Sequence, residues 1–169
     1  MEQRRDQIDS LVLLEEARNG EPQAVSRLLE HYRPYLAMLA RLGASQRLQA
    51  KYDDSDLVQE TLVQVQRDLP NFRGSNEAEL VAWLRRIMAN VSGKQIQHYA
   101  RQRRDASLEQ RIEESFTRSS QMMGESMIAA ETSPSERVIK RERAVILSQA
   151  LAKLPADYRE ALIINRLEG

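Results

Sequence analysis

The chain has 169 residues, and its 25 Lys plus Arg balance 25 Asp plus Glu, so the formal net charge is zero. Hydrophobic residues make up 41% and charged residues 30%, which excludes wholesale disorder and supplies material for a core. The absence of cysteine excludes disulfides, thiolate metal sites and thiol nucleophiles. No apolar run is long enough for a transmembrane helix and no signal-peptide segment opens the sequence, so we expect a cytoplasmic protein without membrane contact.

The composition favours helices along the whole chain. Gly and Pro are scarce, with 6 and 5 residues, and good helix formers such as Leu, Ala, Arg, Glu and Gln dominate. No window alternates apolar and polar residues with the period of two that strands need. The sequence therefore predicts an all-α protein.

The first helices are separated by clear stop and start residues. A short helix is predicted from Ser10 to Arg18, and Asn19-Gly20 ends it because these residues tolerate left-handed backbone. A longer helix with one apolar stripe runs from Pro22 to Gly43. A polar connection over residues 44–52 follows.

The middle of the chain predicts two further helices. One opens at Asp53 with acids in its first turn and runs to about Leu69. The next begins at Asn76, which forms a plausible capping box with Glu79. Ser92-Gly93 predicts a break or a weak point, after which helix continues to about residue 104.

The last third has a weaker pattern. Residues 106–132 are predicted to form a linker with patchy helix. Ser133-Pro134-Ser135-Glu136 is a strong helix start, and Pro155 restarts the chain before a last helix. The apolar residues Leu151, Leu162 and Leu167 then need a cover, either in a compact form or in a dimer.

The helix that opens at Asp53 belongs to an acidic stretch. Seven acidic and two basic residues lie between Asp53 and Glu79. Four positions share one face at spacings i, i+3, i+4 and i+7, namely Asp56, Gln59, Glu60 and Val63. The apolar stripe predicted on the opposite face consists of Val58, Leu62, Val65 and Leu69. The exposed face suits docking on a basic partner helix, and a merely solvated face is the alternative.

The following stretch, residues 85–104, is basic. It holds six basic residues and no acidic one, so it can follow a phosphate backbone. Amides and His98 between the bases can read base edges. A solvated helix face is again the alternative, although the missing acids count against it.

Nothing in the sequence supports catalysis. His31 and His98 have no partner at metal-ligand spacing, and Trp83 lies on an apolar stripe that predicts a core role. No catalytic triad order, phosphate-binding Gly loop or metal motif is present. We therefore expect a protein that is not an enzyme, acts by binding and takes no cofactor.

Three stretches, 54–72, 82–90 and 151–169, together resemble a bacterial RNA polymerase sigma factor of the extracytoplasmic-function (ECF) group, in the sigma-70 family. Asp56-Leu-Val-Gln-Glu-Thr61 and Trp83-Leu-Arg-Arg-Ile87 carry the match, in this order. The resemblance implies sigma region 2 over residues 1–105, a linker over 106–132 and the N-terminal part of sigma region 4 over 133–169. Residues 77–83 and the long linker are similar to ECF proteins common in planctomycetes.

The resemblance assigns roles that agree with the two charged faces. Asp56, Gln59, Glu60 and Val63 would dock on the clamp helices of the largest subunit of core RNA polymerase. Residues implied to contact promoter DNA are Arg85, Arg86, Asn90, Lys94, His98, Arg101, Arg103 and Arg104. Only Tyr99 is aromatic in this stretch, so capture of a flipped base near residues 90–94 fits better than an aromatic wedge. The linker would pass near the active-site channel, and an anti-sigma factor is a further partner that the resemblance allows.

The family's helix-turn-helix, which reads the minus-thirty-five element, would follow residue 169 and is missing here. Residues 133–169 are too few for an independent core, which suggests a truncated chain. Two other functions stay open at this point. One is a helical adaptor or anti-regulator that binds through its acidic face alone, and the other is a transcriptional regulator that has lost its DNA-binding domain.

Overall fold

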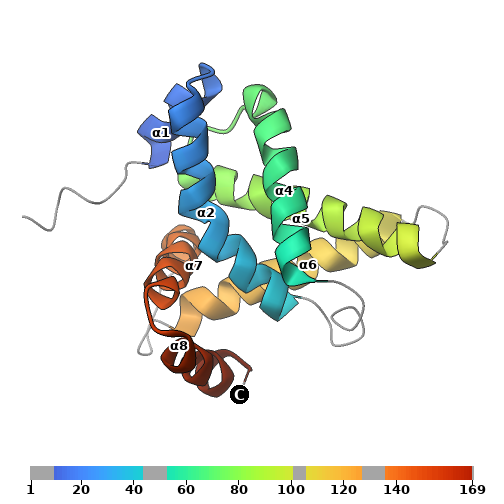
Figure 1. Ribbon diagram of the computed structural model, residues 1–169, viewed down its shortest axis with the longest axis vertical. Helices are drawn as coiled ribbons and strands as arrows, with labels where there is room; N and C mark the ends of the chain where they lie inside the picture. Colours follow the sequence, from blue (N-terminus) through green and yellow to red (C-terminus); the bar gives the residue numbers. More distant parts are fainter. Residues whose placement is uncertain (1–9, 44–52, 101–105, 127–135, 169) are drawn as a thin grey trace, which may run out of the picture.

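The computed structural model describes residues 10–43, 53–100, 106–126 and 136–168 (Figure 1). These ranges hold no strand, which confirms the predicted all-α class. Leu69–Asn71 add a 3-10 turn, η1, and Ile164–Glu168 a π-helical turn, η2. The α-helices are α1 (Ser10–Arg18), α2 (Pro22–Gly43), α4 (Asp54–Asp68), α5 (Glu77–Ala100), α6 (Ala106–Ser126), α7 (Glu136–Ala152) and α8 (Ala156–Ile163).

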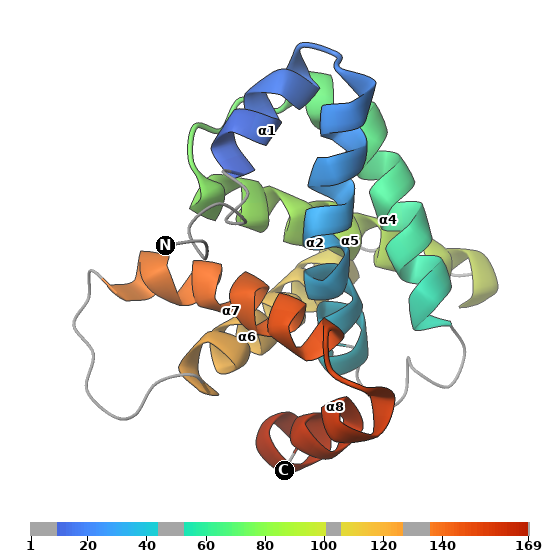
Figure 2. The same ribbon diagram turned by 60° about the vertical axis from the view of Figure 1, so that its left-hand side comes forward.

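Helix α2 runs through the middle of the molecule. It contacts α1, α4, α6 and α7. In Figure 1 α4 stands beside α2 and α5 crosses behind both, while Figure 2 shows α7 and α8 below them. The largest fully buried side chains of α2 include Tyr32, Tyr35 and Leu39, so this helix supplies the centre of the core.

The ends of α1 and α2 confirm the sequence prediction. Gly20 has a φ of 88°, and its amide donates to the carbonyl of Ala17 at 3.1 Å, so the chain leaves α1 through left-handed backbone. Pro22 is the first residue of α2, where its missing amide hydrogen costs nothing.

Helix α4 begins where the sequence predicted, and Asp53 is its N-cap. The Asp53 carboxylate accepts from the amide of Ser55 at 2.8 Å. The predicted apolar stripe is buried, since Leu62 is 4% and Val65 1% exposed. Leu69 is also buried, in the 3-10 turn η1 before Pro70. This buried face fixes which side of α4 is presented to solvent.

The start of α5 is a modified capping box. Asn76 Oδ1 accepts from the amide of Glu79 at 2.9 Å, as predicted. The Glu79 carboxylate accepts from the amide of Ser75 at 2.7 Å, one residue before the position that the motif normally uses. Both bonds satisfy amides at the helix start, so this end of α5 is well defined.

The predicted break at Ser92-Gly93 is wrong, because α5 continues through both residues. Gly93 is buried against α6, and a Cβ built on it would lie only 2.8 Å from Cγ of Glu109. The glycine therefore serves close helix packing instead of a turn.

Residues 106–126 also differ from the prediction of a linker. They form α6, a helix that contacts α2, α5 and α7. Ile112, Phe116 and Met123 are buried and join the core. The apolar residues at spacings of four to seven hold this segment against the N-terminal helices, which its polar composition concealed.

The C-terminal helices lie in a compact arrangement. Leu151 and Leu167 are buried, whereas Leu162 is 45% exposed, so the predicted apolar face is only partly covered. Trp83 is half-buried against Phe72 at a ring distance of 4.8 Å and packs against the edge of the core, so its predicted core role holds only in part. The polar connection at 44–52 and the helix cap at 133–135 lie outside the described residues.

Candidate functional site

The acidic face of α4 is open to solvent. Asp56, Gln59 and Glu60 are exposed, and Val63 beside them is 48% exposed. We call these four residues the docking face. Leu57, Val58 and Leu62 on the opposite side are buried, so the orientation of the docking face is fixed by the core.

Glu60 joins the docking face to α5. Its carboxylate accepts from the side-chain amide of Gln95 at 2.9 Å. Helices α4 and α5 are in contact along this side, and the bond ties an acidic position on one to the basic stretch of the other. The two charged faces that the sequence indicated are therefore neighbours in space.

Four of the predicted DNA-binding residues form a row along α5. Arg86, Asn90, Lys94 and His98 follow one another at intervals of four residues, and all four side chains are exposed. Side chains four residues apart lie on the same face of a helix, one turn above the other. We call this row the α5 strip. Its two permanent cations and its amide have the chemistry needed for phosphates and base edges.

Arg85 does not belong to that row. Its side chain is buried, with 4% of the residue exposed, and its Nη1 donates to Tyr35 Oη at 3.1 Å. Tyr35 Oη also lies 2.9 Å from Oγ of Ser120 on α6. Arg85 was expected to hold a phosphate. In this structure it is not accessible to one, because α5 turns this position toward α2 and α6.

Arg86 is exposed but has an acidic neighbour. Its Nε lies 3.7 Å from Oε1 of Glu113 on α6, with side-chain exposures of 63% and 39%. A pair this open to solvent is weak. Arg101, Arg103 and Arg104, the last predicted DNA contacts, lie outside the described residues.

The loop between α4 and α5 is held from α1. Arg18 donates from Nη1 to the carbonyl of Gly74 at 3.2 Å and from Nη2 to that of Phe72. The Arg18 guanidinium also lies 5.5 Å from the centre of the Phe72 ring. A Cβ on Gly74 would fall 2.2 Å from that ring, so glycine is required there. This clamp positions the first turn of α5.

Burial changes the pKa values of two groups, one on α2 and one at the start of α4. It lowers the pKa of His31, whose ring lies 3.1 Å from the side-chain amide of Gln149 on α7. It raises the pKa of Asp54 at the start of α4, and repulsion from Asp53 adds to this shift. Neither group lies in a cluster of ligating side chains, and within the described ranges no group of three His, Asp or Glu residues could hold a metal ion.

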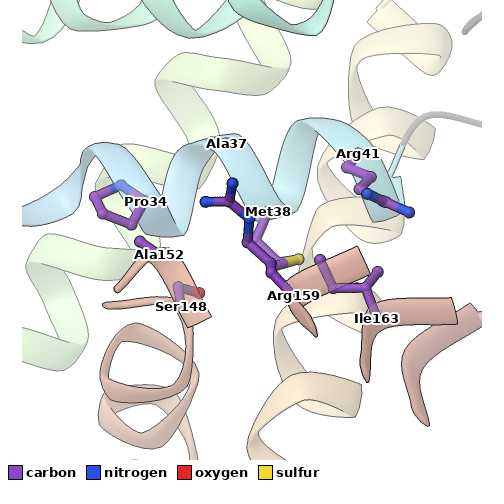
Figure 3. A pocket seen from close by; sticks show the side chains of 8 residues that line it. All are labelled: Pro34, Ala37, Met38, Arg41, Ser148, Ala152, Arg159 and Ile163. Carbon is purple, nitrogen blue, oxygen red and sulfur yellow. The ribbon is translucent and has the colours of Figure 1, made fainter. Parts of the chain in front are cut away.

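A cavity of about 210 Å³ lies where α2 meets α7 and α8. Figure 3 shows Met38 from α2 and Ile163 from α8 on its wall, with Arg159 reaching over it. Arg41 at its edge forms a two-bond ion pair with Glu160, at 2.6 and 2.8 Å. The cavity is lined by few polar groups and lies apart from the docking face and the α5 strip.

Sequence reasoning did not single out Glu109 and Glu113, the α6 acids that approach α5. The signal was present: both stand one residue after an apolar position in the series Leu108, Ile112 and Phe116. That series has helical spacing, so the acids flank a buried stripe. The low apolar content of the segment hid it.

The sigma-70 region 2 family matches residues 28–105, which include most of α2, all of α4 and α5, and both charged faces. The ECF RNA polymerase sigma-E factor of Haemophilus influenzae is 24% identical over 164 residues, which cover 97% of this chain and 80% of that protein. The sigma-E factor of Escherichia coli K12 is also 24% identical, over 97% of this chain and 79% of that protein. No solved structure matches the chain with comparable significance.

The comparisons agree with the geometry and decide between the open alternatives. Neither a helical adaptor nor a transcriptional regulator without its DNA-binding domain is expected to contain sigma-70 region 2. Among the described helices, none is long and apolar enough to cross a membrane. Members of this family are not enzymes and act by binding. Residues 28–105 match sigma-70 region 2 and nearly the whole chain is similar to ECF sigma-E factors, so the chain acts as a sigma factor for RNA polymerase in the initiation of transcription.

Proposed function

We propose that the docking face of α4 binds core RNA polymerase and that the α5 strip contacts promoter DNA. The observation that carries the proposal is the exposure of all four docking-face residues on a helix whose other side is locked into the core. As the resemblance implies, the partner surface is the clamp helices of the largest polymerase subunit. Residues 1–105 then act as region 2, although α6 shows that the packed unit extends further.

The chemistry of the docking face suits a basic helical partner. Asp56 and Glu60 supply negative charge, and Gln59 supplies both a donor and an acceptor. Val63 adds an exposed apolar group at one end. Complementary charge speeds encounter and fixes register, while the apolar contact resists dissociation.

Charge reversal tests this assignment. Glu60→Lys should lower the affinity for core RNA polymerase at least about tenfold, since a cation would face a cationic partner. Glu16→Lys is the matched control, because Glu16 is an exposed acid on α1 away from the docking face. Binding can be measured by co-purification and by anisotropy of a labelled chain. Equal loss in both variants would indicate a general charge effect and remove the assignment.

The α5 strip offers separate positions for holding and for reading DNA. Lys94→Ala should weaken binding to any sequence and reduce the salt dependence of log K by about 0.7 to 0.9 per lost phosphate contact. Lys153→Ala, an exposed lysine after α7, is the control and should change neither value. An unaltered salt slope in Lys94→Ala would contradict a phosphate contact there.

Asn90 is the candidate for base reading, with its exposed amide between Arg86 and Lys94. We propose that an unstacked base of the minus-ten element is held between Asn90 and Lys94. Asn90→Ala should alter the preference among promoter sequences while leaving the salt slope unchanged. Competitive binding of a promoter library to the holoenzyme measures both.

Three finer expectations stay hypotheses. One is a linker path near the polymerase active-site channel, and the packed α6 would have to leave its present place to follow it. Another is an anti-sigma factor, which would compete with core polymerase if it covered the docking face. The last, the planctomycete-type grouping, rests on the linker and residues 77–83 alone.

A further inference from the structure

Helix α6 lies directly beside the α5 strip. Glu109 of α6 contacts the backbone of α5 at Gly93, and Glu113, one turn further along α6, reaches Arg86. Gly93 and Arg86 are seven residues apart, or two turns of α5, so the two helices run antiparallel here. Two carboxylates of α6 therefore flank the surface on which the proposed function places DNA.

The same helix also removes a cation from the surface. Arg85 is buried and donates to Tyr35 Oη, and Ser120 of α6 completes this chain of bonds. The described residues place no carboxylate in salt-bridge contact with this guanidinium, although a buried cation is costly to leave without a counter-charge. Displacing α6 would open Arg85 to a phosphate oxygen, which is the partner its charge lacks.

Helix α6 is held by buried apolar side chains and by polar contacts with α5 and α2. Ile112, Phe116 and Met123 bury an apolar stripe against the rest of the molecule. The polar contacts with α5 and α2 include the Arg86–Glu113 pair and the Tyr35–Ser120 hydrogen bond. An anionic ligand on α5 would compete with the former and repel Glu109 and Glu113.

We propose that α6 is an autoinhibitory element that weakens DNA binding by the free protein. In the closed arrangement it places Glu113 beside Arg86, buries Arg85 and lines the α5 strip with two negative charges. Movement of α6 away from α5 removes all three effects at once. This inference rests on the proposed contact between the α5 strip and DNA, and it adds the regulation of that contact.

A reversible cross-link tests the proposal in the full chain, which has no cysteine of its own. In the double variant Gly93→Cys, Glu109→Cys the two Cβ atoms would lie about 4 Å apart, within the range of a disulfide, because Glu109 Cγ is 2.8 Å from the Gly93 Cβ position. The probe is a fluorescein-labelled DNA duplex with a central mismatched bubble, measured by anisotropy at low salt. Oxidised and reduced samples of the same variant carry the same substitutions, so each serves as the control of the other.

The oxidised protein should bind the bubble DNA at least about tenfold more weakly than the reduced protein, because only the reduced form can populate the open state. Equal binding by the two forms overturns the inference but leaves the proposed DNA contact intact. Failure of wild type and of both forms to bind, with each folded by circular dichroism, overturns the DNA contact and the inference together.

A second pair of variants distinguishes the specific effect of Glu113 on Arg86 from a general effect of net charge on α6. Glu113→Gln removes the partner of Arg86 and should raise affinity for the bubble DNA about two- to fivefold. Glu114→Gln changes the net charge equally, but the Glu114 carboxylate accepts from Gln110 of its own helix at 3.0 Å. An equal gain in DNA affinity in both variants would contradict a specific inhibitory contact between Glu113 and Arg86.

Discussion

The helices α1, α2, α4 and α5 differ from α6, α7 and α8 in how they are held together. The first group shares an apolar interior in which Tyr32, Leu36, Leu62 and Met88 are at most 4% exposed. Among the side chains that the structure describes, the second group reaches that interior through fewer apolar residues. It adds polar contacts to α2, namely Ser120 to Tyr35, Gln149 to His31 and Glu160 to Arg41.

The C-terminal helices also expose large apolar side chains to solvent. Tyr158 on α8 is 69% exposed, and Leu162 beside it also remains largely open. Burial of apolar area supplies most of the stability of a helix packing, whereas a single polar contact contributes a smaller net amount. The comparison indicates a durable N-terminal unit that carries both binding faces, and a C-terminal group that can rearrange around it.

The largest expected effect comes from opening a cavity in the durable unit. Leu62→Ala should reduce the free energy of unfolding by about 2–5 kcal/mol, because it removes buried methyl groups from the α4 stripe. Leu11→Ala, at a residue 39% exposed on α1, should cost much less. Urea denaturation measures both. Similar losses at the two sites would contradict the proposed position of the core.

Tyr35→Phe tests the polar link between the two groups. It leaves Arg85 and Ser120 without their shared partner, so we expect a loss of about 1–3 kcal/mol in the free energy of unfolding. Ser120→Ala removes only one end of the chain of bonds and should cost less. A neutral Tyr35→Phe would show that the buried network contributes nothing to the closed arrangement.

A pH dependence should arise at the α2–α7 contact. Burial lowers the pKa of His31, so the unfolded chain takes up a proton at that ring before the folded chain does. Stability should therefore fall as the pH drops below about 6.5, the usual value for histidine, toward the lower folded value. His31→Gln should flatten this part of the curve, measured as urea midpoints between pH 7.5 and pH 5. An unchanged slope would contradict the assignment.

The smallest expected effect is at the Arg41–Glu160 pair on the surface. Hydrogen bonds from Arg41 lower the pKa of Glu160, so its contribution is present above the unfolded pKa and disappears as the pH falls through the folded one. Thermal midpoints of wild type and Glu160→Gln should differ slightly at neutral pH and coincide in acid. A difference that persists in acid would mean that the pair acts through packing instead.

The comparison also explains which features could be predicted from the sequence. Local signals sufficed for the ends of α1 and α2, for the Asp53 cap and for the α4 stripe, because these depend on neighbours within one or two turns. The continuity of α5 through Gly93 depends on Glu109, sixteen positions away along the chain, so no local rule predicts it. The burial of Arg85 could not be predicted for the same reason, since Tyr35 and Ser120 come from distant helices.

The docking face is the most direct point at which to test the account. Because the chain lacks cysteine, single variants Val63→Cys and Val12→Cys can each carry one environment-sensitive fluorophore. The two valines are similarly exposed, at 48% and 51%, but Val63 lies on the docking face and Val12 on α1. On titration with core RNA polymerase, the label at Val63 should become shielded from solvent and the label at Val12 should not. Shielding at Val12 alone, or at neither position while the complex forms, would contradict docking through α4.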